Sequence, residues 1–473
     1  MTPTHNTAAA PELSAGIFKA YDIRGVVDDT LTEEAVRLVG CALAVKAREK
    51  GVTTMIVGRD GRLSGPRLSS ALAAGINLGG VDVIDIGMVP TPVVYFATYE
   101  LNTGSGVAVT GSHNPPDYNG LKMMLDGETL YGEAIKELYD IAVSGNLDKK
   151  LAGITPGKTT TMDVRERYLD RIVGDIKLAR PMKVAVDAGN GVAGELGPEL
   201  FRRLGCEVTE LFCEIDGNFP NHHPDPAEPE NLEDLVESLH TTDAEIGIAF
   251  DGDGDRLGLV TKDGEMIFPD RQLMLFAQDV LSRVPGGEIV FDVKCSRNVA
   301  HWIRQHGGKP TMWLTGHSLV KAKLRECGAP LAGEMSGHIF FKERWYGFDD
   351  GLYAGARMLE ILSREADPSA VLKALPNSPT TPELKLQTAE GENFKLVERL
   401  QAIADQFEGA SEIITIDGLR VEYPDGFGLA RPSNTTPVVV MRFEADTAEA
   451  LARIQTAFAQ AIKSVAPDAR LPY

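Results

Sequence analysis

The segment DGDGDR places aspartates at three alternate positions, Asp251, Asp253 and Asp255. Carboxylates with this spacing lie on one side of an extended segment, and the glycines between them let the backbone curl so that the oxygens converge. Oxygen ligands of this kind favour Mg²⁺ or a similar hard cation. An EF-hand loop would have Gly and Glu where this segment has Arg256 and Lys262, so an EF-hand is excluded. A magnesium site and a solvated acidic turn remain, and the second leaves unexplained why the acids follow the apolar run IGIAF.

A serine follows a short apolar run in the segment VAVTGSHNPP, which begins at residue 107. The run VAV is too short for a helix, and turn-forming residues follow it, so the segment predicts a buried strand that opens into a loop. Ser112 then lies at the end of a strand, where open α/β sheets bind their ligands. The alternative is a loop serine whose hydroxyl bonds its own backbone.

Two further loops are rich in polar side chains. GEMSGH, residues 333–338, places Glu, Ser and His between glycines, but such a set also fits an ordinary polar turn. RPSNTTP, residues 431–437, offers a guanidinium, hydroxyls and an amide, which suits a phosphate because Arg bonds it in bidentate fashion. Its alternative is an ordinary turn bounded by prolines. Weaker signals come from single residues in other segments: Lys294 in DVKCS, His317 in LTGHS, and Tyr21 and Arg24 in FKAYDIRG.

The elements that must position these loops occur in one arrangement three times. Each copy has an apolar strand ending in a polar loop, a helical stretch, and a second apolar strand ending in a glycine-rich polar loop. The paired strand segments are MIVGRDGR with GVAVTGSHNP, VAVDAGNG with IGIAFDGDGDR, and IVFDVKCS with PLAGEMSGH. Helical candidates between them cover residues 68–79, 194–205 and 297–307. A tandem repeat of this kind predicts three related α/β domains with mixed, largely parallel sheets and right-handed crossovers.

The predicted domain organisation follows these repeats. The first residues lack the basic and apolar regions of a signal peptide and predict a disordered arm. A stretch rich in Pro, Ser and Thr after the third repeat predicts a linker, and the helices and strands beyond it predict a smaller α+β domain. The predicted boundaries are 1–15 for the arm, 16–158, 159–264 and 265–374 for the α/β domains, 375–384 for the linker and 385–473 for the α+β domain.

Composition excludes several classes of partner. The 473 residues suffice for roughly three or four domains. The net charge of −21 argues against nucleic acid or an anionic membrane surface, so an anionic ligand must be bound by a local cluster of Arg and Lys. The five cysteines are scattered without a C-x-x-C pair, which favours neither a disulfide framework nor a zinc site and fits the cytoplasm. No apolar run is long enough to span a membrane.

The segments TGSHNP, DGDGDR, GEMSGH and RPSNTTP occur in the order and relative spacing of the α-D-phosphohexomutase family. From about residue 16 to about residue 470 the chain resembles the bacterial phosphomannomutase/phosphoglucomutase branch of that family. The resemblance implies three related α/β domains and a C-terminal domain similar in fold to the TATA-binding-protein class, arranged around a central cleft. It also implies reversible phosphoryl transfer between O1 and O6 of mannose and glucose phosphates, through a phosphoserine enzyme and a 1,6-bisphosphosugar intermediate.

The same resemblance assigns roles to individual residues. Ser112 is expected to carry the phosphoryl group and to hold one Mg²⁺ per chain with Asp251, Asp253 and Asp255. Residues expected around the transferring group are Arg24, His113, Lys122, Arg256 and His338. The candidates for general acid and base are His338 and Lys122, which the sequence does not rank. Residues expected to bind the sugar are Glu334, Met335, Ser336, Gly337 and His338. Residues expected to bind the nonreacting phosphate are Arg431, Pro432, Ser433, Asn434 and Thr435, aided by Tyr21, Lys294 and His317.

These roles agree with the electrostatics of phosphoryl transfer. A phosphoserine carries a charge of about −1.5 to −2, so in a cleft it needs a cation and basic side chains nearby. The transfer itself depends mainly on positioning and charge neutralisation.

The expected partner is a small phosphosugar, with glucose or mannose 1,6-bisphosphate as activator and intermediate. Neither nucleic acid nor a membrane is expected as a partner, and the chain is expected to be monomeric. Three other functions remain as alternatives. A phosphoglucosamine mutase usually has Gln where this chain has Met335. An aspartyl-phosphate phosphatase would use Asp251 and Asp253 as a D-x-D pair, and a cation-binding protein would have no catalytic role.

Overall fold

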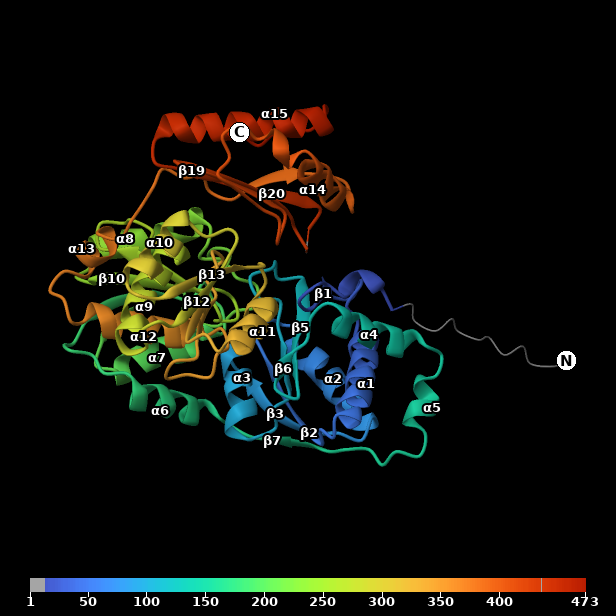
Figure 1. Ribbon diagram of the computed structural model, residues 1–473. Helices are drawn as coiled ribbons and strands as arrows, with labels where there is room; N and C mark the ends of the chain where they lie inside the picture. Colours follow the sequence, from blue (N-terminus) through green and yellow to red (C-terminus); the bar gives the residue numbers. More distant parts are fainter. Residues whose placement is uncertain (1–12, 435) are drawn as a thin grey trace.

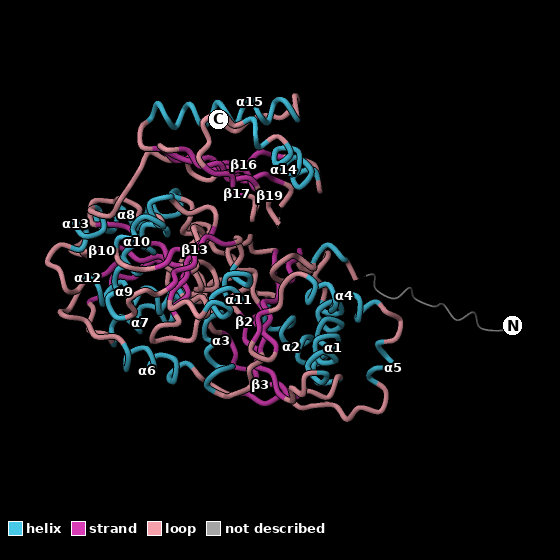
Figure 2. The backbone as a smooth tube through the Cα atoms, in the orientation of Figure 1, coloured by secondary structure: helices cyan, strands magenta, loops and turns pink. Residues whose placement is uncertain are grey.

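The computed structural model describes residues 13–434 and 436–473, which contain four separate β-sheets. The first three sheets with their helices form one large body, and the fourth lies above it with the C-terminal helix outermost (Figure 1). The tube in Figure 2 shows the single extended segment that leads from the large body to the fourth sheet. Most of the predicted arm and the predicted site residue Thr435 lie outside the described residues, and a short 3₁₀ helix, η1, covers Ala15–Ile17.

The first domain is a mixed sheet with helices on both faces. Its elements are β1 (Ile23–Val26), α1 (Glu33–Glu49), β2 (Thr54–Arg59), α2 (Gly65–Leu78), β3 (Asp82–Met88), α3 (Thr91–Glu100), β4 (Gly106–Val109), β5 (Tyr118–Leu125), β6 (Glu128–Thr129), α4 (Glu133–Val143), α5 (Leu147–Leu151) and β7 (Thr159–Thr161). Helix α1 begins at Thr32, whose hydroxyl accepts a hydrogen bond from the amide of Ala35. Residues of α1, α2 and α4 share one core with the sheet, and α3 covers the other face. Strand β7 follows the predicted boundary at residue 158 yet pairs with β3, so the first sheet extends beyond that boundary.

The second and third domains each have a four-stranded sheet. The elements of the second are α6 (Arg165–Asp175), β8 (Lys183–Asp187), α7 (Ala193–Arg203), β9 (Glu207–Leu211), η2 (Pro229–Leu232), α8 (Glu233–Thr241), β10 (Ile246–Phe250) and β11 (Leu257–Thr261). Those of the third are α9 (Pro269–Arg283), β12 (Glu288–Asp292), α10 (Arg297–Gln305), β13 (Lys309–Trp313), α11 (His317–Cys327), β14 (Leu331–Gly333), β15 (Ile339–Phe341), α12 (Gly351–Leu362) and α13 (Pro368–Lys373). One apolar core runs from the α3 face of the first domain through both.

The three sheets share one topology, as the tandem repeat predicts. The common strands lie in the order β3-β2-β4-β5, β9-β8-β10-β11 and β13-β12-β14-β15. In each set the first three strands are parallel and the fourth is antiparallel to the third. The strand pairs expected from the sequence are therefore neighbours in every copy, and the helical candidates correspond to α2, α7 and α10. The predicted class, three α/β domains with mixed, largely parallel sheets plus an α+β domain, is confirmed.

The fourth domain is an antiparallel sheet with helices on one face. Its elements are β16 (Leu384–Gln387), α14 (Glu392–Ala402), η3 (Ala404–Gln406), β17 (Glu412–Ile414), β18 (Leu419–Tyr423), β19 (Gly426–Pro432), β20 (Val438–Ala445) and α15 (Ala448–Val465). The strand order is β16-β20-β19-β18-β17, and β16 begins at the last residue of the predicted linker. Two buried arginines fix the open face of the sheet to the third domain. Arg420 donates to the carbonyl of Val293 at 2.6 Å, and Arg442 donates to Asp270 at 3.0 Å.

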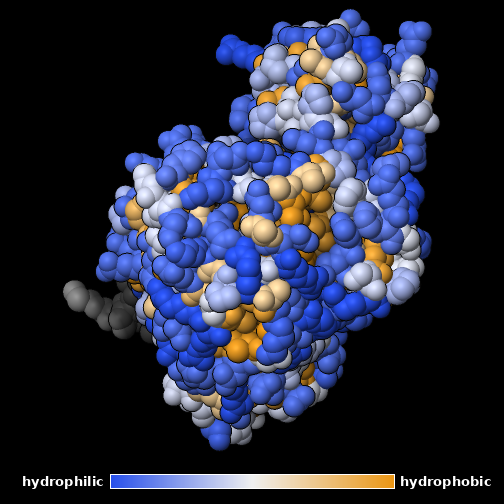
Figure 3. Space-filling model, turned by 90° about the vertical axis from the view of Figure 1, so that its left-hand side faces the viewer, coloured by the Kyte–Doolittle hydropathy of each residue, from blue (hydrophilic) through white to orange (hydrophobic). Residues whose placement is uncertain are grey.

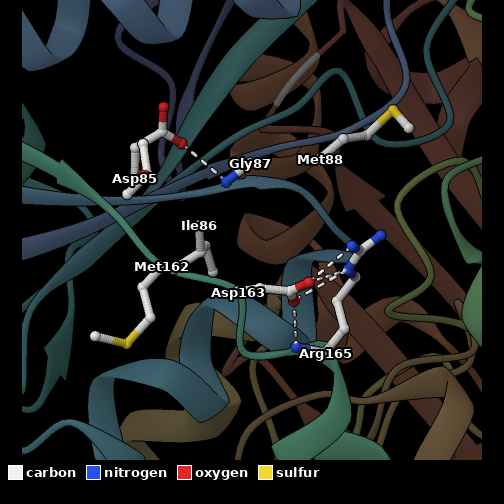
Figure 4. A pocket seen from close by; sticks show the side chains of 8 residues that line it. Asp85, Ile86, Gly87, Met88, Met162, Asp163 and Arg165 are labelled. Carbon is white, nitrogen blue, oxygen red and sulfur yellow. Dashed lines mark hydrogen bonds and ion pairs between the residues drawn. The ribbon is translucent and has the colours of Figure 1, made fainter.

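The surface gives few other indications of function. The face in Figure 3 is mostly hydrophilic, with apolar side chains in separate small groups. In the described part of the chain, every helix is too short or too polar to cross a membrane. A pocket of about 390 Å³ lies where β3 meets the segment after β7 (Figure 4), and none of the predicted site residues line it. Within this pocket Asp163 pairs with Arg165 at 2.8 Å.

Candidate active site

Ser112 lies in the loop directly after β4, as the strand-and-loop prediction requires. The side chain is buried, and its Oγ donates a hydrogen bond to Asp251 Oδ2 at 3.1 Å and lies 3.2 Å from His113 Nδ1. Its backbone has φ of 50°, in the left-handed region, which costs a residue with a Cβ about 1–2 kcal/mol. The surrounding structure must therefore hold the serine in a conformation that the residue by itself disfavours.

The loop after β10 brings the three aspartates together beside that serine. Asp251, Asp253 and Asp255 are fully buried, and one oxygen of each lies within 4.8 Å of the others. A Cβ at Gly252 would lie 2.4 Å from Ser112 O, so only glycine lets the two loops approach this closely. Among the described residues, Asp253 Oδ1 and Asp255 Oδ1 have no hydrogen-bond partner. Three buried carboxylates, two of them with an unpaired oxygen, fit the donor set of a divalent cation.

Lys122 on β5 supplies positive charge to this cluster. Its Nζ lies 2.8 Å from Asp253 Oδ2 and 2.5 Å from Asp255 Oδ2. Burial works against the charged ammonium, but the aspartates outweigh burial and raise the pKa of Lys122 above its usual range. Burial likewise opposes ionisation of Asp253, yet Lys122 lowers the pKa of that carboxyl. Burial and its two acidic neighbours raise the pKa of Asp251. The pKa values of Asp251 and Asp253 are therefore shifted in opposite directions within one site.

Two arginines frame the serine and the aspartates. Arg24 NH1 donates to the carbonyl of Gly111 at 2.7 Å, and its guanidinium also pairs with Asp22. Arg256 Nε lies 3.8 Å from Asp251 Oδ2, and the other arm of this guanidinium lies 3.8 Å from Asp225. Both arginines therefore contact the serine loop or the acidic cluster beside it.

His338 closes the far side of this group from the third domain. Arg256 Nε donates to His338 Nε2 at 3.1 Å, so Nε2 carries a lone pair and the ring hydrogen is on Nδ1. That Nδ1 lies 3.0 Å from Asp349 Oδ2 and 3.5 Å from Asp255 Oδ1. Asp349 is itself paired with Lys321 at 2.8 Å. Sequence reasoning missed Asp349 and Lys321, because no local spacing links them to the histidine.

The loop after β14 carries the predicted sugar-binding residues. Glu334 Oε1 accepts a hydrogen bond from the amide of Gly316 at 2.6 Å, and its Oε2 has no partner among the described residues. Burial raises the pKa of Glu334 to about 7. Ser336 is partly exposed, and Gly337 has φ of 100°, which favours glycine. The Met335 side chain differs from the expectation: it is buried, and its sulfur lies 3.1 Å from Arg442 NH1 at the junction with the fourth domain.

The end of β19 and the loop after it carry the predicted phosphate-binding residues. Arg431 Nε donates to Asp417 Oδ2 at 3.0 Å, and its NH2 has no partner in the described part of the chain. Pro432 is the last residue of β19, and Ser433 Oγ accepts a hydrogen bond from the amide of Thr436. Asn434 donates to the hydroxyl of Tyr21, which in turn donates to the carbonyl of Thr315 at 2.8 Å. The first, third and fourth domains meet at these residues.

The two remaining predicted residues lie in the third domain. Lys294 Nζ pairs with Glu383 at 2.6 Å, and the pKa of this buried lysine is raised because Glu383 and Asp292 outweigh burial. His317 is the first residue of α11, and its ring centroid lies 5.6 Å from that of His338. Burial and the charge of Lys321 lower the pKa of His317, so it is neutral beside the acidic cluster.

Comparison with known proteins links all four domains to one family. Four models described as phosphoglucomutase/phosphomannomutase match this chain: alpha/beta/alpha domains I, II and III at residues 15–148, 166–264 and 268–378, and the C-terminal domain at residues 383–461. A phosphoglucomutase of Neisseria gonorrhoeae is 59% identical over 96% of this chain and 98% of its own. A phosphomannomutase/phosphoglucomutase of Pseudomonas aeruginosa is 53% identical over 99% of each chain.

Solved structures agree with these matches. A crystal structure of a phosphoglucomutase/phosphomannomutase family protein from Burkholderia thailandensis has a TM-score of 0.92 and 61% identity, and the match covers 98% of this chain and 100% of that chain. An Aspergillus fumigatus N-acetylphosphoglucosamine mutase, solved with GlcNAc-6P and magnesium, has a TM-score of 0.63 and 15% identity over 95% of this chain and 97% of that chain. The second likeness concerns the fold alone.

Proposed function

The chain belongs to the phosphoglucomutase/phosphomannomutase family, and from this premise we propose that it transfers a phosphoryl group reversibly between O1 and O6 of glucose and mannose phosphates. The observation that carries the proposal is the contact between Ser112 Oγ and Asp251 Oδ2 at 3.1 Å. It joins a hydroxyl that can carry a phosphoryl group to a buried acidic cluster suited to a divalent cation. Phosphoryl transfer needs this combination of a positioned nucleophile and concentrated positive charge.

The reaction proceeds in two transfers that use one serine. Phosphoserine at position 112 gives its phosphoryl group to the free hydroxyl of a hexose phosphate: the Ser112 O–P bond breaks, a sugar O–P bond forms, and the hydroxyl loses its proton. The resulting 1,6-bisphosphosugar turns end over end in the cleft. Its original phosphate then returns to Ser112, which restores the phosphoenzyme and releases the isomer.

The contacts of His338 and Lys122 favour one division of roles between them. His338 takes the hydroxyl proton on Nε2 after the substrate hydroxyl replaces the Arg256 N–H that this nitrogen accepts in the structure, and Asp349 lies 3.0 Å from Nδ1 on the other side of the ring. Lys122 keeps its charge because its pKa is raised, so it stabilises the oxygens of the transferring group. Arg24 and Arg256 act in the same way from the two sides of the loop.

The residues that would hold Mg²⁺ are Ser112, Asp251, Asp253 and Asp255, one ion per chain. When bound, the ion supplies positive charge that offsets the phosphoserine and the carboxylates. Glucose or mannose 1,6-bisphosphate serves as activator, because it returns phosphate to a serine that has lost it.

The remaining groups bind the substrate at both ends of the cleft. Glu334 and Ser336 bond sugar hydroxyls, with Gly337 giving the loop its turn. Arg431, Ser433 and Asn434 bind the nonreacting phosphate with Lys294, and Thr435 keeps its proposed place in the same loop. The site draws on all four domains of a single chain, so we propose a monomer. Its five cysteines are unpaired, which suits the cytoplasm.

The alternatives receive less support from the same observations. The relative at 59% identity is named a phosphoglucomutase and the one at 53% a phosphomannomutase/phosphoglucomutase, whereas the N-acetylphosphoglucosamine mutase is 15% identical. An aspartyl-phosphate phosphatase would leave the Ser112 contact without a purpose.

A coupled assay tests the proposed function directly. Formation of glucose 6-phosphate from glucose 1-phosphate is followed with Mg²⁺ and a catalytic amount of bisphosphate. We expect turnover in the wild type and a loss of about a thousandfold or more in Ser112→Ala, because the nucleophile is removed. Ser144→Ala, at an exposed helix end, is the matched control and keeps full activity. Undiminished turnover in Ser112→Ala would overturn the assignment.

A further inference from the structure

We propose that Arg62, with Asp60 and Thr110, forms a buried clamp that sets the conformation of the Ser112 loop, and that these three are positioning residues for the phosphoryl carrier. The inference rests on the proposed function, because it concerns how Ser112 is held. The segment GRDGR, residues 58–62, begins in the last two residues of β2 and carries Asp60 and Arg62 directly after that strand, which is the neighbour of β4 in the sheet. None of the roles assigned above uses it.

Arg62 holds the serine loop by its backbone. Its guanidinium is almost fully buried and donates to the carbonyls of Ser112 at 2.9 Å, Asn114 at 2.5 Å and Tyr118 at 3.0 Å, and also to that of Pro115. Four carbonyls from a single loop thus converge on one planar cation. The guanidinium presents its N–H donors as a planar fork that reaches these carbonyls together, which a lysine ammonium cannot do.

Two further observations show how closely the loop lies against this guanidinium. A Cβ at Gly111 would lie 2.3 Å from Arg62 Cζ, so only glycine fits at that position. On the second domain, the ring of Phe219 lies 5.0 Å from Arg62 Cζ and covers the cation. The guanidinium is enclosed by the serine loop and a neighbouring domain, without access to substrate.

Asp60 and Thr110 extend the clamp to the amide of the serine. The buried carboxylate of Asp60 accepts hydrogen bonds from Arg62 Nε at 3.2 Å, Gly111 N at 3.1 Å and Thr110 Oγ1 at 2.8 Å. The same Thr110 oxygen accepts a hydrogen bond from Ser112 N at 2.8 Å. The amide and the carbonyl of Ser112 are therefore both fixed by one connected network.

The clamp explains how Ser112 keeps its left-handed backbone. With φ of 50°, a serine needs external support on both sides of its Cα, and the network supplies a partner to its amide and to its carbonyl. Loss of that support would let Ser112 Oγ leave its place 3.1 Å from Asp251. A displacement of about 1 Å of a reacting group is enough to slow a reaction about a hundredfold.

The first test is Arg62→Lys, which keeps the charge and removes the fork. We expect kcat to fall about a hundredfold while KM stays within about threefold, because Arg62 touches no substrate group. Arg357→Lys is the matched control: that arginine is equally buried, pairs with Glu343 and Asp279, and belongs to no proposed site. It reports the stability cost of the exchange, measured as the melting temperature, and should keep wild-type kcat.

The second test does not depend on tolerance of a lysine at position 62. Thr110→Val removes the hydroxyl that links Asp60 to Ser112 N, and Thr110→Ser restores it in a smaller side chain. We expect kcat to fall about tenfold in the valine variant and to stay within about threefold of wild type in the serine variant. If the clamp had only a structural role, Thr110→Val would lower the melting temperature but would have the same kcat as Thr110→Ser.

The outcomes separate the clamp from the proposed function. Wild-type kcat in folded Arg62→Lys, or equal kcat in Thr110→Val and Thr110→Ser, overturns the clamp. If Ser112→Ala also retained full turnover, the phosphoserine itself would be wrong. If Ser112→Ala is inactive while Arg62→Lys is fully active, the clamp is refuted and the assignment of Ser112 is kept.

Discussion

Glu334 is buried and one of its carboxylate oxygens is unpaired among the described residues. Its ionisation should therefore make sugar binding depend on pH. Its pKa is raised to about 7 by burial, so the side chain is protonated below that pH and ionised above it. The ionised carboxylate is the stronger acceptor for sugar hydroxyls. We therefore expect KM for glucose 1-phosphate to fall as pH rises from about 6 to about 8.

Glu334→Gln provides the comparison for this prediction. The amide does not titrate, so its KM should change much less over the same range. The substrate phosphate titrates near pH 6 in both proteins, and the ratio of the two KM values removes that contribution. Parallel KM profiles in the two proteins would refute the titration of Glu334.

Residues with a local signal could be predicted from the sequence, and residues that act through distant partners could not. Ser112 and the aspartates of DGDGDR stand out because their spacing and their place after apolar runs are visible in a few residues. Asp349 is a single acid whose contact with His338 exists only in three dimensions. Met335 was expected at the sugar, but its side chain lies against Arg442, which the sequence places in another domain.

At the scale of secondary-structure elements, equivalent positions of the first and third domains make the same hydrogen bond. Asp60 follows β2 and accepts a hydrogen bond from Gly111 N, and Asp292 ends β12 and accepts one from Met335 N, both at 3.1 Å. The registers Arg59 with Val109 and Phe291 with Gly333 make these pairs equivalent, so Ser112 and Ser336 occupy matching places. The strand pairs were predictable from the sequence. The hydrogen bonds of Asp60 and Asp292 were not predictable, because no sequence pattern marks an aspartate that will be buried.

We expect the loop after β10 to make catalysis depend on a divalent cation. Its three buried carboxylates would repel a phosphoserine at position 112 unless positive charge is added to that of Lys122. We expect EDTA to abolish turnover in the coupled assay and Mg²⁺ to restore it. The melting temperature of the chelated enzyme serves as the control for unfolding. Full turnover in metal-free buffer would contradict this dependence.

At the scale of the whole molecule, contacts between domains join the first, third and fourth domains beside the predicted phosphate-binding residues. The Tyr21 hydroxyl of the first domain bonds Thr315 of the third and Asn434 of the fourth. The fourth domain is also fixed to the third by Arg420 and Arg442. The sequence predicted the four domains and their order along the chain. It did not predict these junctions, because pairs such as Tyr21 and Asn434 are far apart in sequence.

Tyr21→Phe removes the hydroxyl that joins three domains. We expect KM to rise about threefold to tenfold, the effect of a lost hydrogen bond, with a smaller change in kcat. Tyr473→Phe, which removes an exposed hydroxyl bonded to Gln455, is the matched control. An unchanged KM in Tyr21→Phe would show that the contact does not contribute to binding.

The proposed mechanism requires the site to accept the bisphosphosugar in two opposite orientations, so we expect no strict contact at C2. Glucose and mannose differ only at that carbon, and a site without a dedicated partner for its hydroxyl discriminates weakly. We expect the two kcat/KM values, measured at the same Mg²⁺ and bisphosphate concentrations, to lie within about one to two powers of ten. A preference above about a thousandfold would show that a residue reads O2.

The proposed role of Ser112 as carrier of the phosphoryl group can be tested by following the phosphate itself. The enzyme is incubated with bisphosphosugar labelled in its phosphates, the phosphoenzyme is isolated, and the modified residue is mapped by peptide mass spectrometry. We expect acid-stable label on Ser112 that passes to added glucose 1-phosphate at least as fast as kcat. Label on Asp251 or Asp253, sensitive to base and hydroxylamine, or label on Ser112 that does not reach the sugar, would contradict it.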